Sequence, residues 1–197
     1  LVIDYLAKAD KNTVINLTNH AFFNLGKTHA EDIFNTKFLV ASSRYLVTDE
    51  GSIPTGELKY VKNTPFDFTS FKPLGLDIHA QDGQLKNARG YDVTFPLDGY
   101  PSADGAPFFA AALTNPSTGL RLEVLTTEPS IHLYTGNFLE GADCGKNGIP
   151  CALHSAVCLE AQHFPDSPNK TAFPSVLLKA GEEFKSCTVY KVSADVI

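Results

Sequence analysis

The chain has 197 residues and a formal net charge of −6 at pH 7. A chain of this length buries about 70% of its unfolded surface, so we expect one domain over residues 1–197. No run of about 18 apolar residues is present, which argues against a membrane-spanning helix. No basic cluster is present, so we expect no nucleic acid partner. The chain lacks methionine and opens on an apolar segment, and we therefore expect this domain to be N-terminally incomplete.

Short segments rich in β-branched and aromatic residues follow one another along the chain, separated by Gly, Pro, Asn and Asp. One weak helix is predicted at residues 75–90. The clearest strand, residues 120–126, alternates apolar and charged side chains, which is typical of a half-solvated antiparallel strand. Strands are predicted at residues 1–8, 13–18, 38–40, 45–47, 58–61, 90–97, 108–114, 120–126, 130–138, 156–159, 173–178 and 185–192.

The spacing of these strands indicates the fold class. Strands that recur about every 8–12 residues, with turn residues between them, are typical of β-sandwiches and barrels. We therefore predict an all-β, predominantly antiparallel β-sandwich. Its helix content should be below about a tenth, far under the usual ~30–35%.

The four cysteines give no metal-binding motif, because no two of them form a Cys-x-x-Cys pair. Cys144 and Cys151 bracket a Gly-rich loop and could form a disulfide if the protein is exported. Cys158 lies in an apolar run, and we expect it to be a small buried hydrophobe. Cysteine usage leaves the compartment open. We expect a cytoplasmic location, with secreted or periplasmic location as the alternative.

One acidic residue stands out by its surroundings. Glu160 follows an apolar run at residues 156–159, and Gln162 and His163 lie close to it before Pro165 ends the strand. Burial disfavours the charged form of a carboxyl and raises its pKa, which is one way to make a general base. The alternative is a carboxylate paired with a nearby Lys or Arg.

Three further polar residues lie on or beside predicted strands. His20 is flanked by Asn19 and Asn24, whose amides can fix an imidazole tautomer, although a core histidine with satisfied hydrogen bonds is the alternative. Asp92 opens a strand, or else caps a turn beside glycine. His132 lies on a strand, either at a site or simply on its polar face.

Taken together, these segments resemble the C-terminal part of the aldose 1-epimerase (galactose mutarotase) family, in the family's order and over almost the whole chain. The matching segments are residues 16–20 (Asn-Leu-Thr-Asn-His), 23–25 (Phe-Asn-Leu), 53–56 (Ile-Pro-Thr-Gly), 90–92 (Gly-Tyr-Asp), 127–129 (Thr-Glu-Pro), 134–138 (Tyr-Thr-Gly-Asn-Phe), 158–162 (Cys-Leu-Glu-Ala-Gln) and 164–166 (Phe-Pro-Asp).

The resemblance implies a large antiparallel β-sandwich with a sugar cleft across it. It implies that Glu160 is the general base and His20 the general acid. Asp92 is then a ligand of sugar hydroxyls, with Asn19 and Gln162 as further substrate-binding candidates. The expected partner is a monosaccharide, and the oligomeric state is left open.

The sequence departs from the family pattern at two positions. His132 stands where the family often has a glutamine that binds sugar, and we keep it as a substrate-binding candidate. Val93 follows the aspartate, where the family often has histidine. The family's N-terminal half normally adds an Asn-Arg pair and a second histidine, which are not found in this chain.

The implied reaction is the interconversion of the α and β anomers of a free hexose such as galactose or glucose. The C1 hydroxyl loses a proton while the ring oxygen gains one, the ring opens, the C1–C2 bond rotates and the ring closes. One carboxylate base and one imidazolium acid suffice, so no metal or other cofactor is expected.

Two alternatives come from other functional classes. A glycoside hydrolase would also use two carboxylates, here Glu160 and Asp92. A non-catalytic carbohydrate-binding module would keep the fold without acid–base function.

Overall fold

The computed structural model describes residues 1–141 and 144–194, which form strands joined by loops and a few short helical turns. The strands are β1 (Val2–Lys8), β2 (Thr13–Val14), β3 (Phe22–Phe23), β4 (Lys37–Val40), β5 (Arg44–Thr48), β6 (Pro54–Tyr60), β7 (Lys72–Pro73), β8 (Asp92–Pro96), β9 (Phe108–Thr114), β10 (Leu120–Thr126), β11 (Ser130–Tyr134), β12 (Val157–Gln162), β13 (Leu177–Leu178) and β14 (Glu183–Ala194). The helical elements are α1 (Gly83–Ala88) and three 3₁₀ turns at Leu74–Leu76, Lys146–Gly148 and Ser167–Asn169. No helix among the described residues has the length and apolar character needed to cross a membrane.

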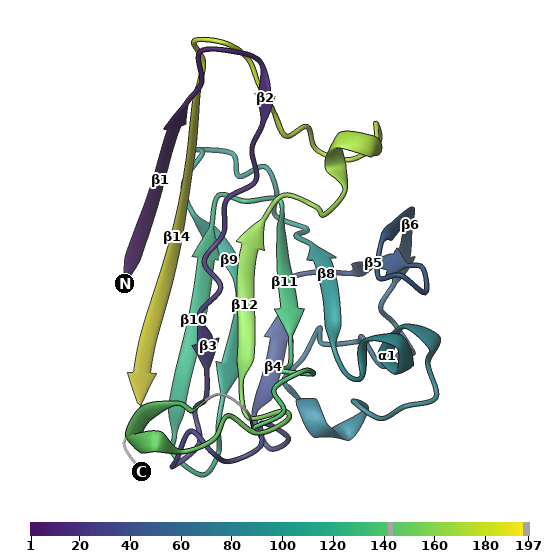
Figure 1. Ribbon diagram of the computed structural model, residues 1–197, viewed down its shortest axis with the longest axis vertical. Coiled ribbons are helices and arrows are strands. Elements are labelled where there is room, and N and C mark those ends of the chain that lie inside the picture. Colours follow the sequence, from purple (N-terminus) through teal and green to yellow (C-terminus); the bar gives the residue numbers. More distant parts are fainter. Residues whose placement is uncertain (142–143, 195–197) are drawn as a thin grey trace.

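Two antiparallel sheets form the body of the molecule. The larger has six strands in the order β1-β14-β10-β9-β4-β7, and the smaller has four in the order β3-β12-β11-β8. The four-stranded sheet lies in front of the larger one in Figure 1. The pairs β13-β2 and β5-β6 form two small additional sheets. The predicted all-β, antiparallel β-sandwich with little helix is confirmed.

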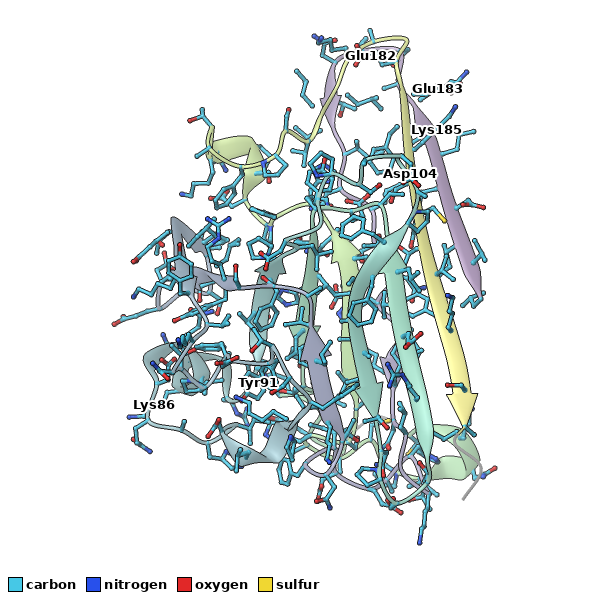
Figure 2. The ribbon with its side chains drawn as sticks, turned by 180° about the vertical axis from the view of Figure 1, so that it is seen from behind. Lys86, Tyr91, Asp104, Glu182, Glu183 and Lys185 are labelled. Atoms are coloured by element: carbon cyan, nitrogen blue, oxygen red, sulfur yellow. The ribbon has the colours of Figure 1, made fainter. Side chains whose placement is uncertain are left out.

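The α-helix α1 is shorter than the segment predicted for it. Asp82 caps its N-terminus by accepting hydrogen bonds from the backbone N–H groups of Gln84 and Leu85. Arg89, at φ 60°, ends it in the left-handed conformation. Lys86 projects outward from α1, whereas Tyr91 lies inside the body of the protein (Figure 2).

The predicted strand at residues 13–18 is reduced to β2. Beyond Val14, the Asn16 side chain replaces a strand ladder: its amide donates to the His163 backbone oxygen at 3.0 Å, and its Oδ1 accepts from the His163 N–H at 3.0 Å. The predicted strand at residues 173–178 is likewise reduced to β13. Pro174 has no N–H to donate to a ladder, and β13 pairs only with the two residues of β2.

The strands of the smaller sheet separate apolar from polar side chains. Successive residues of a strand point to opposite faces. In β8, β11 and β12 one set of alternating residues is buried in the core: Val93, Phe95, Ile131, Leu133, Val157, Leu159 and Ala161. The residues that alternate with this set include Asp92, His132 and Glu160, which therefore lie together on the other face.

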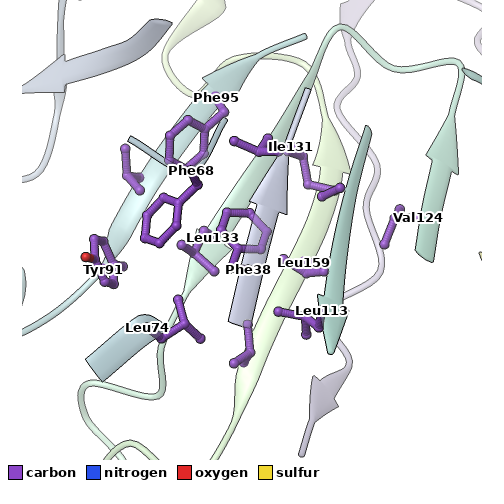
Figure 3. Packing of buried hydrophobic residues seen from close by; sticks show 14 of the residues in the cluster. Phe38, Phe68, Leu74, Tyr91, Phe95, Leu113, Val124, Ile131, Leu133 and Leu159 are labelled. Carbon is purple, nitrogen blue, oxygen red and sulfur yellow. The ribbon is translucent and has the colours of Figure 1, made fainter. Parts of the chain in front are cut away.

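An aromatic cluster fills part of the space between the sheets (Figure 3). The Phe68 ring centroid lies 5.0 Å from that of Phe38, 5.1 Å from that of Tyr91 and 6.3 Å from that of Phe95. The Tyr91 hydroxyl donates to the Pro65 backbone oxygen at 3.1 Å. Because these rings pack under the four-stranded sheet, they fix the strands that carry its polar face.

Truncating one of these rings should weaken the whole sandwich. Phe95→Ala is expected to lower the free energy of unfolding by about 3–5 kcal/mol, because Phe95 is fully buried and its loss leaves a cavity. Urea denaturation measures this change. The control is Tyr60→Ala, at a side chain that is 72% exposed, which should change stability by less than about 0.5 kcal/mol. Equal effects of the two changes would contradict this account of the core.

Candidate active site

Register places the predicted site residues side by side on the outer face of the four-stranded sheet. His132 on β11 pairs with Glu160 on β12 and with Thr94 on β8. Two residues along β11, Tyr134 pairs with Asp92 on β8 and with Cys158 on β12. Residues in register share a face, so this surface gathers two carboxyls, an imidazole, two hydroxyls and a thiol.

His132 is held by protein atoms at both ring nitrogens. Its Nε2 lies 2.7 Å from Asp92 Oδ1, and its Nδ1 lies 2.8 Å from Thr94 Oγ1. Its side chain is 17% exposed and that of Asp92 is 30% exposed. This pairing orients the Asp92 carboxylate through Oδ1 and leaves Oδ2 outside the contact with His132.

Glu160 and His20 lie opposite each other. Glu160 Oε1 is 3.5 Å from His20 Nε2, and the side chains are 10% and 54% exposed respectively. The His20 ring stacks on Phe22, with centroids 5.1 Å apart and planes 24° apart, and meets the edge of Tyr134 at 6.3 Å. A buried carboxyl thus faces an imidazole that solvent can reach.

The surroundings of Glu160 change its acidity. Burial raises the pKa of the Glu160 carboxyl above its usual range. His132 and then His20 oppose this rise in pKa, because positive charge favours the carboxylate, whereas the Asp92 carboxylate adds to it. Glu160 is therefore a stronger proton acceptor than an exposed glutamate once it has lost its proton.

Replacing His132 should change this balance in a measurable way. His132→Gln keeps an amide that can donate to Asp92 but removes the imidazole, so we expect the pKa of Glu160 to rise further. NMR titration of the Glu160 carboxyl carbon measures it. Thr94→Val is the matched control, because it removes the partner of Nδ1 and leaves the imidazole beside Glu160; it should shift the pKa less. An unchanged or lower pKa in His132→Gln would contradict this electrostatic account.

The remaining predicted binding residues lie at different places relative to this face. Gln162 follows Glu160 by two positions on β12, so it lies on the same face. The Asn19 side chain accepts a hydrogen bond from the Ala21 backbone N–H at 3.2 Å, which stabilises the turn that precedes β3. Asn19 thus positions the backbone beside His20, and a contact of its own with substrate stays a prediction.

Sequence reasoning missed a third carboxyl–imidazole pair, beside the site. Glu128 Oε2 lies 2.7 Å from His163 Nδ1, and the Glu128 side chain is 3% exposed. Together with the two Asn16 hydrogen bonds to the His163 backbone, this pair fixes the chain just after β12. Glu128 belongs to the Thr-Glu-Pro segment at residues 127–129, which contributes to the family resemblance but does not by itself indicate a partner for Glu128. Cys144 and Cys151 do not form the disulfide that their spacing allows and are free thiols.

The family model described as aldose 1-epimerase matches residues 1–191. Mouse galactose mutarotase is 41% identical over 193 residues, which cover 98% of this chain and 54% of the mouse protein. The aldose 1-epimerase of Escherichia coli K12 is 38% identical over 195 residues, which cover 98% of this chain and 55% of that protein. The chain therefore spans about half the length of the curated relatives it matches.

Solved structures show the same likeness. A GalM/aldose epimerase homologue from Caenorhabditis elegans superposes with a TM-score of 0.82 at 26% identity, over 98% of this chain and 55% of that one. The galactose 1-epimerase from Lactobacillus acidophilus gives a TM-score of 0.79 at 29% identity, over 98% and 53% of the two chains.

Proposed function

This chain belongs to the aldose 1-epimerase family, and from that membership we propose that its protein interconverts the α and β anomers of a free hexose such as galactose or glucose. The observation that carries the proposal is the buried Glu160 carboxyl facing the exposed His20 imidazole at 3.5 Å. The mutarotase and epimerase names of the relatives support the same reaction.

The proposed reaction uses Glu160 as base and His20 as acid. Glu160 takes the proton of the C1 hydroxyl while His20 gives a proton to the ring oxygen, so the C1–O bond of the ring breaks and an aldehyde forms. Rotation about the C1–C2 bond presents the other face of the carbonyl. Ring closure then returns both protons, and the net result is the other anomer. Each positioned acid or base typically contributes about 10²–10⁴-fold.

The geometry indicates which group adjusts when the sugar enters. The two atoms lie 3.5 Å apart, so a sugar must separate them to reach both. Glu160 is fixed on a central part of β12, whereas His20 precedes the two-residue strand β3 and is half exposed. We therefore infer that His20 moves outward over the sugar while Glu160 stays in place.

The other polar residues of the face fit the binding of hydroxyl groups. Asp92, held by His132, offers its second carboxylate oxygen as an acceptor, and Gln162 offers an amide with both a donor and an acceptor. In this proposal His132 is a positioning residue, which departs from its predicted direct contact with sugar.

Polarimetry on the complete purified protein tests the proposal. Freshly dissolved α-D-glucose or α-D-galactose should approach its equilibrium rotation faster with the protein than without it, and no new product should appear. Release of sugar from a glycoside would instead support hydrolysis by Glu160 and Asp92. Sugar binding without any acceleration would support the carbohydrate-binding module and overturn the proposed reaction.

A further inference from the structure

We propose that the same face binds one Zn²⁺ ion through His20, Cys158 and Glu160, and that this ion inhibits the protein. One ring nitrogen of His20, the Cys158 sulfur and one Glu160 carboxylate oxygen all lie within 4.8 Å of one another. Cys158 and Glu160 are both buried, at 0% and 7% exposure. The proposed reaction does not use the Cys158 thiol.

The three ligand types select the class of ion. Zn²⁺ binds imidazole nitrogen, thiolate sulfur and carboxylate oxygen, whereas Mg²⁺ and Ca²⁺ prefer sites made of oxygen alone. With bond lengths of about 2.0–2.3 Å in a tetrahedral site, neighbouring ligand atoms lie roughly 3.3–3.8 Å apart. The His20–Glu160 separation of 3.5 Å already matches this spacing. Because all three atoms lie within 4.8 Å of one another, the sulfur needs to approach the other two by no more than about 1.0–1.5 Å to reach this spacing.

The local structure explains why the three groups can close on an ion. Cys158 and Glu160 are alternate residues of β12 and point to the same face, so the strand fixes both. His20 is 54% exposed, so its ring can turn toward the sulfur by shifting on the Phe22 ring against which it stacks. Three protein ligands leave a fourth tetrahedral position for water.

Binding requires the thiol to give up its proton. Burial raises the pKa of the Cys158 thiol, so the metal-free group is protonated. The zinc–sulfur bond forms as the sulfur–hydrogen bond breaks, and the proton leaves to solvent. No oxidation or reduction takes place.

The inhibitory consequence rests on the proposed function, whereas the metal site does not. An ion on Glu160 and His20 occupies the groups assigned as base and acid, and it also fills the space between them. Zn²⁺ and sugar should therefore exclude each other. This consequence distinguishes an inhibitory ion from a resident cofactor, which would support turnover.

Metal binding is tested on the complete protein with Zn²⁺ by calorimetry and with Co²⁺ by absorption spectroscopy. The wild type should show a thiolate-to-cobalt charge-transfer band. Cys158→Ser should abolish that band and weaken Zn²⁺ binding by at least about tenfold, since loss of even an outer-shell partner costs 10–100-fold. The matched control is Cys151→Ser, which should bind both ions as the wild type does.

Two results would overturn the metal site: Zn²⁺ affinity that Cys158→Ser leaves unchanged, or a cobalt band that Cys151→Ser removes. If Cys158→Ser does not fold, His20→Asn takes its place. It should also weaken Zn²⁺ binding by at least about tenfold, because it removes a ligand at an exposed position.

Inhibition is measured separately by polarimetry with added Zn²⁺. The initial rate should fall, excess sugar should restore it, and Cys158→Ser should resist the inhibition. A protein that binds Zn²⁺ through Cys158 but never accelerates mutarotation would leave the metal site standing and overturn the proposed function. An active protein that binds Zn²⁺ through Cys158 without loss of rate would overturn the inhibitory part.

Discussion

Replacing Glu160 with glutamine is expected to slow anomer interconversion by about 10²–10⁴-fold, the usual contribution of a positioned general base. Glutamine keeps the shape of the side chain and its place on β12, but it cannot accept the proton of the C1 hydroxyl. Sugar binding should change little, because the change removes an interaction that matters in the transition state. Polarimetry gives the rate, and calorimetry with galactose gives the affinity.

The control for this variant is Glu123→Gln. Glu123 lies on β10 in the other sheet and pairs with Arg121 at 2.7 Å, so the same chemical change there should leave the rate unchanged. If Glu160→Gln kept a near-normal rate, Glu160 would not be the base. Sugar binding would then favour the carbohydrate-binding module.

The same carboxyl predicts how the wild-type rate depends on pH. Only the ionised form of Glu160 can accept a proton, and its pKa is raised by burial. The rate should therefore be full above that raised pKa and should fall as the pH drops through it. The fall should begin at a higher pH than an exposed glutamate would give. In Glu160→Gln the residual rate should lose this acidic limb.

The fold could be predicted from the local alternation of apolar and polar residues wherever one face of a strand is buried. The alternation in residues 120–126 predicted β10 with its exact bounds, because a period of two leaves only one arrangement that buries the apolar side chains. The strand predictions were wrong where side-chain hydrogen bonds replace the backbone hydrogen bonds between strands. Asn16 hydrogen-bonds the backbone of His163, 147 positions away, and no local signal marks that partner.

The identity of the site residues could be predicted from the sequence. Which of these side chains contact each other could not. Glu160, His20, Asp92 and His132 were each selected from their strand positions or from the family resemblance. The Asp92–His132 pair depends on the register of β8 against β11, which residues 40 positions apart do not reveal. The buried Glu128–His163 pair is set in the same way by two loops that meet only in the folded chain.

Replacing His20 with asparagine is expected to slow turnover by about 10²–10⁴-fold, because the ring oxygen then lacks its proton donor. Asparagine still fits beside Phe22 and can hydrogen-bond a sugar, so affinity for galactose should be nearly preserved. His20 also lowers the pKa of Glu160, so the acidic limb of the rate should move to higher pH in the variant.

The matched control is His79→Asn. His79 is an exposed histidine that meets the edge of Phe34, away from Glu160, so this variant should keep both the rate and the acidic limb of the wild type. Polarimetry across the pH range measures both variants. If His20→Asn kept a near-normal rate, another group would be the acid, and His20 would serve only to pack against the sugar. Because His20 is exposed, the substitution leaves the buried core of the sandwich unchanged. A loss of rate in this variant therefore reports on the reaction and not on folding.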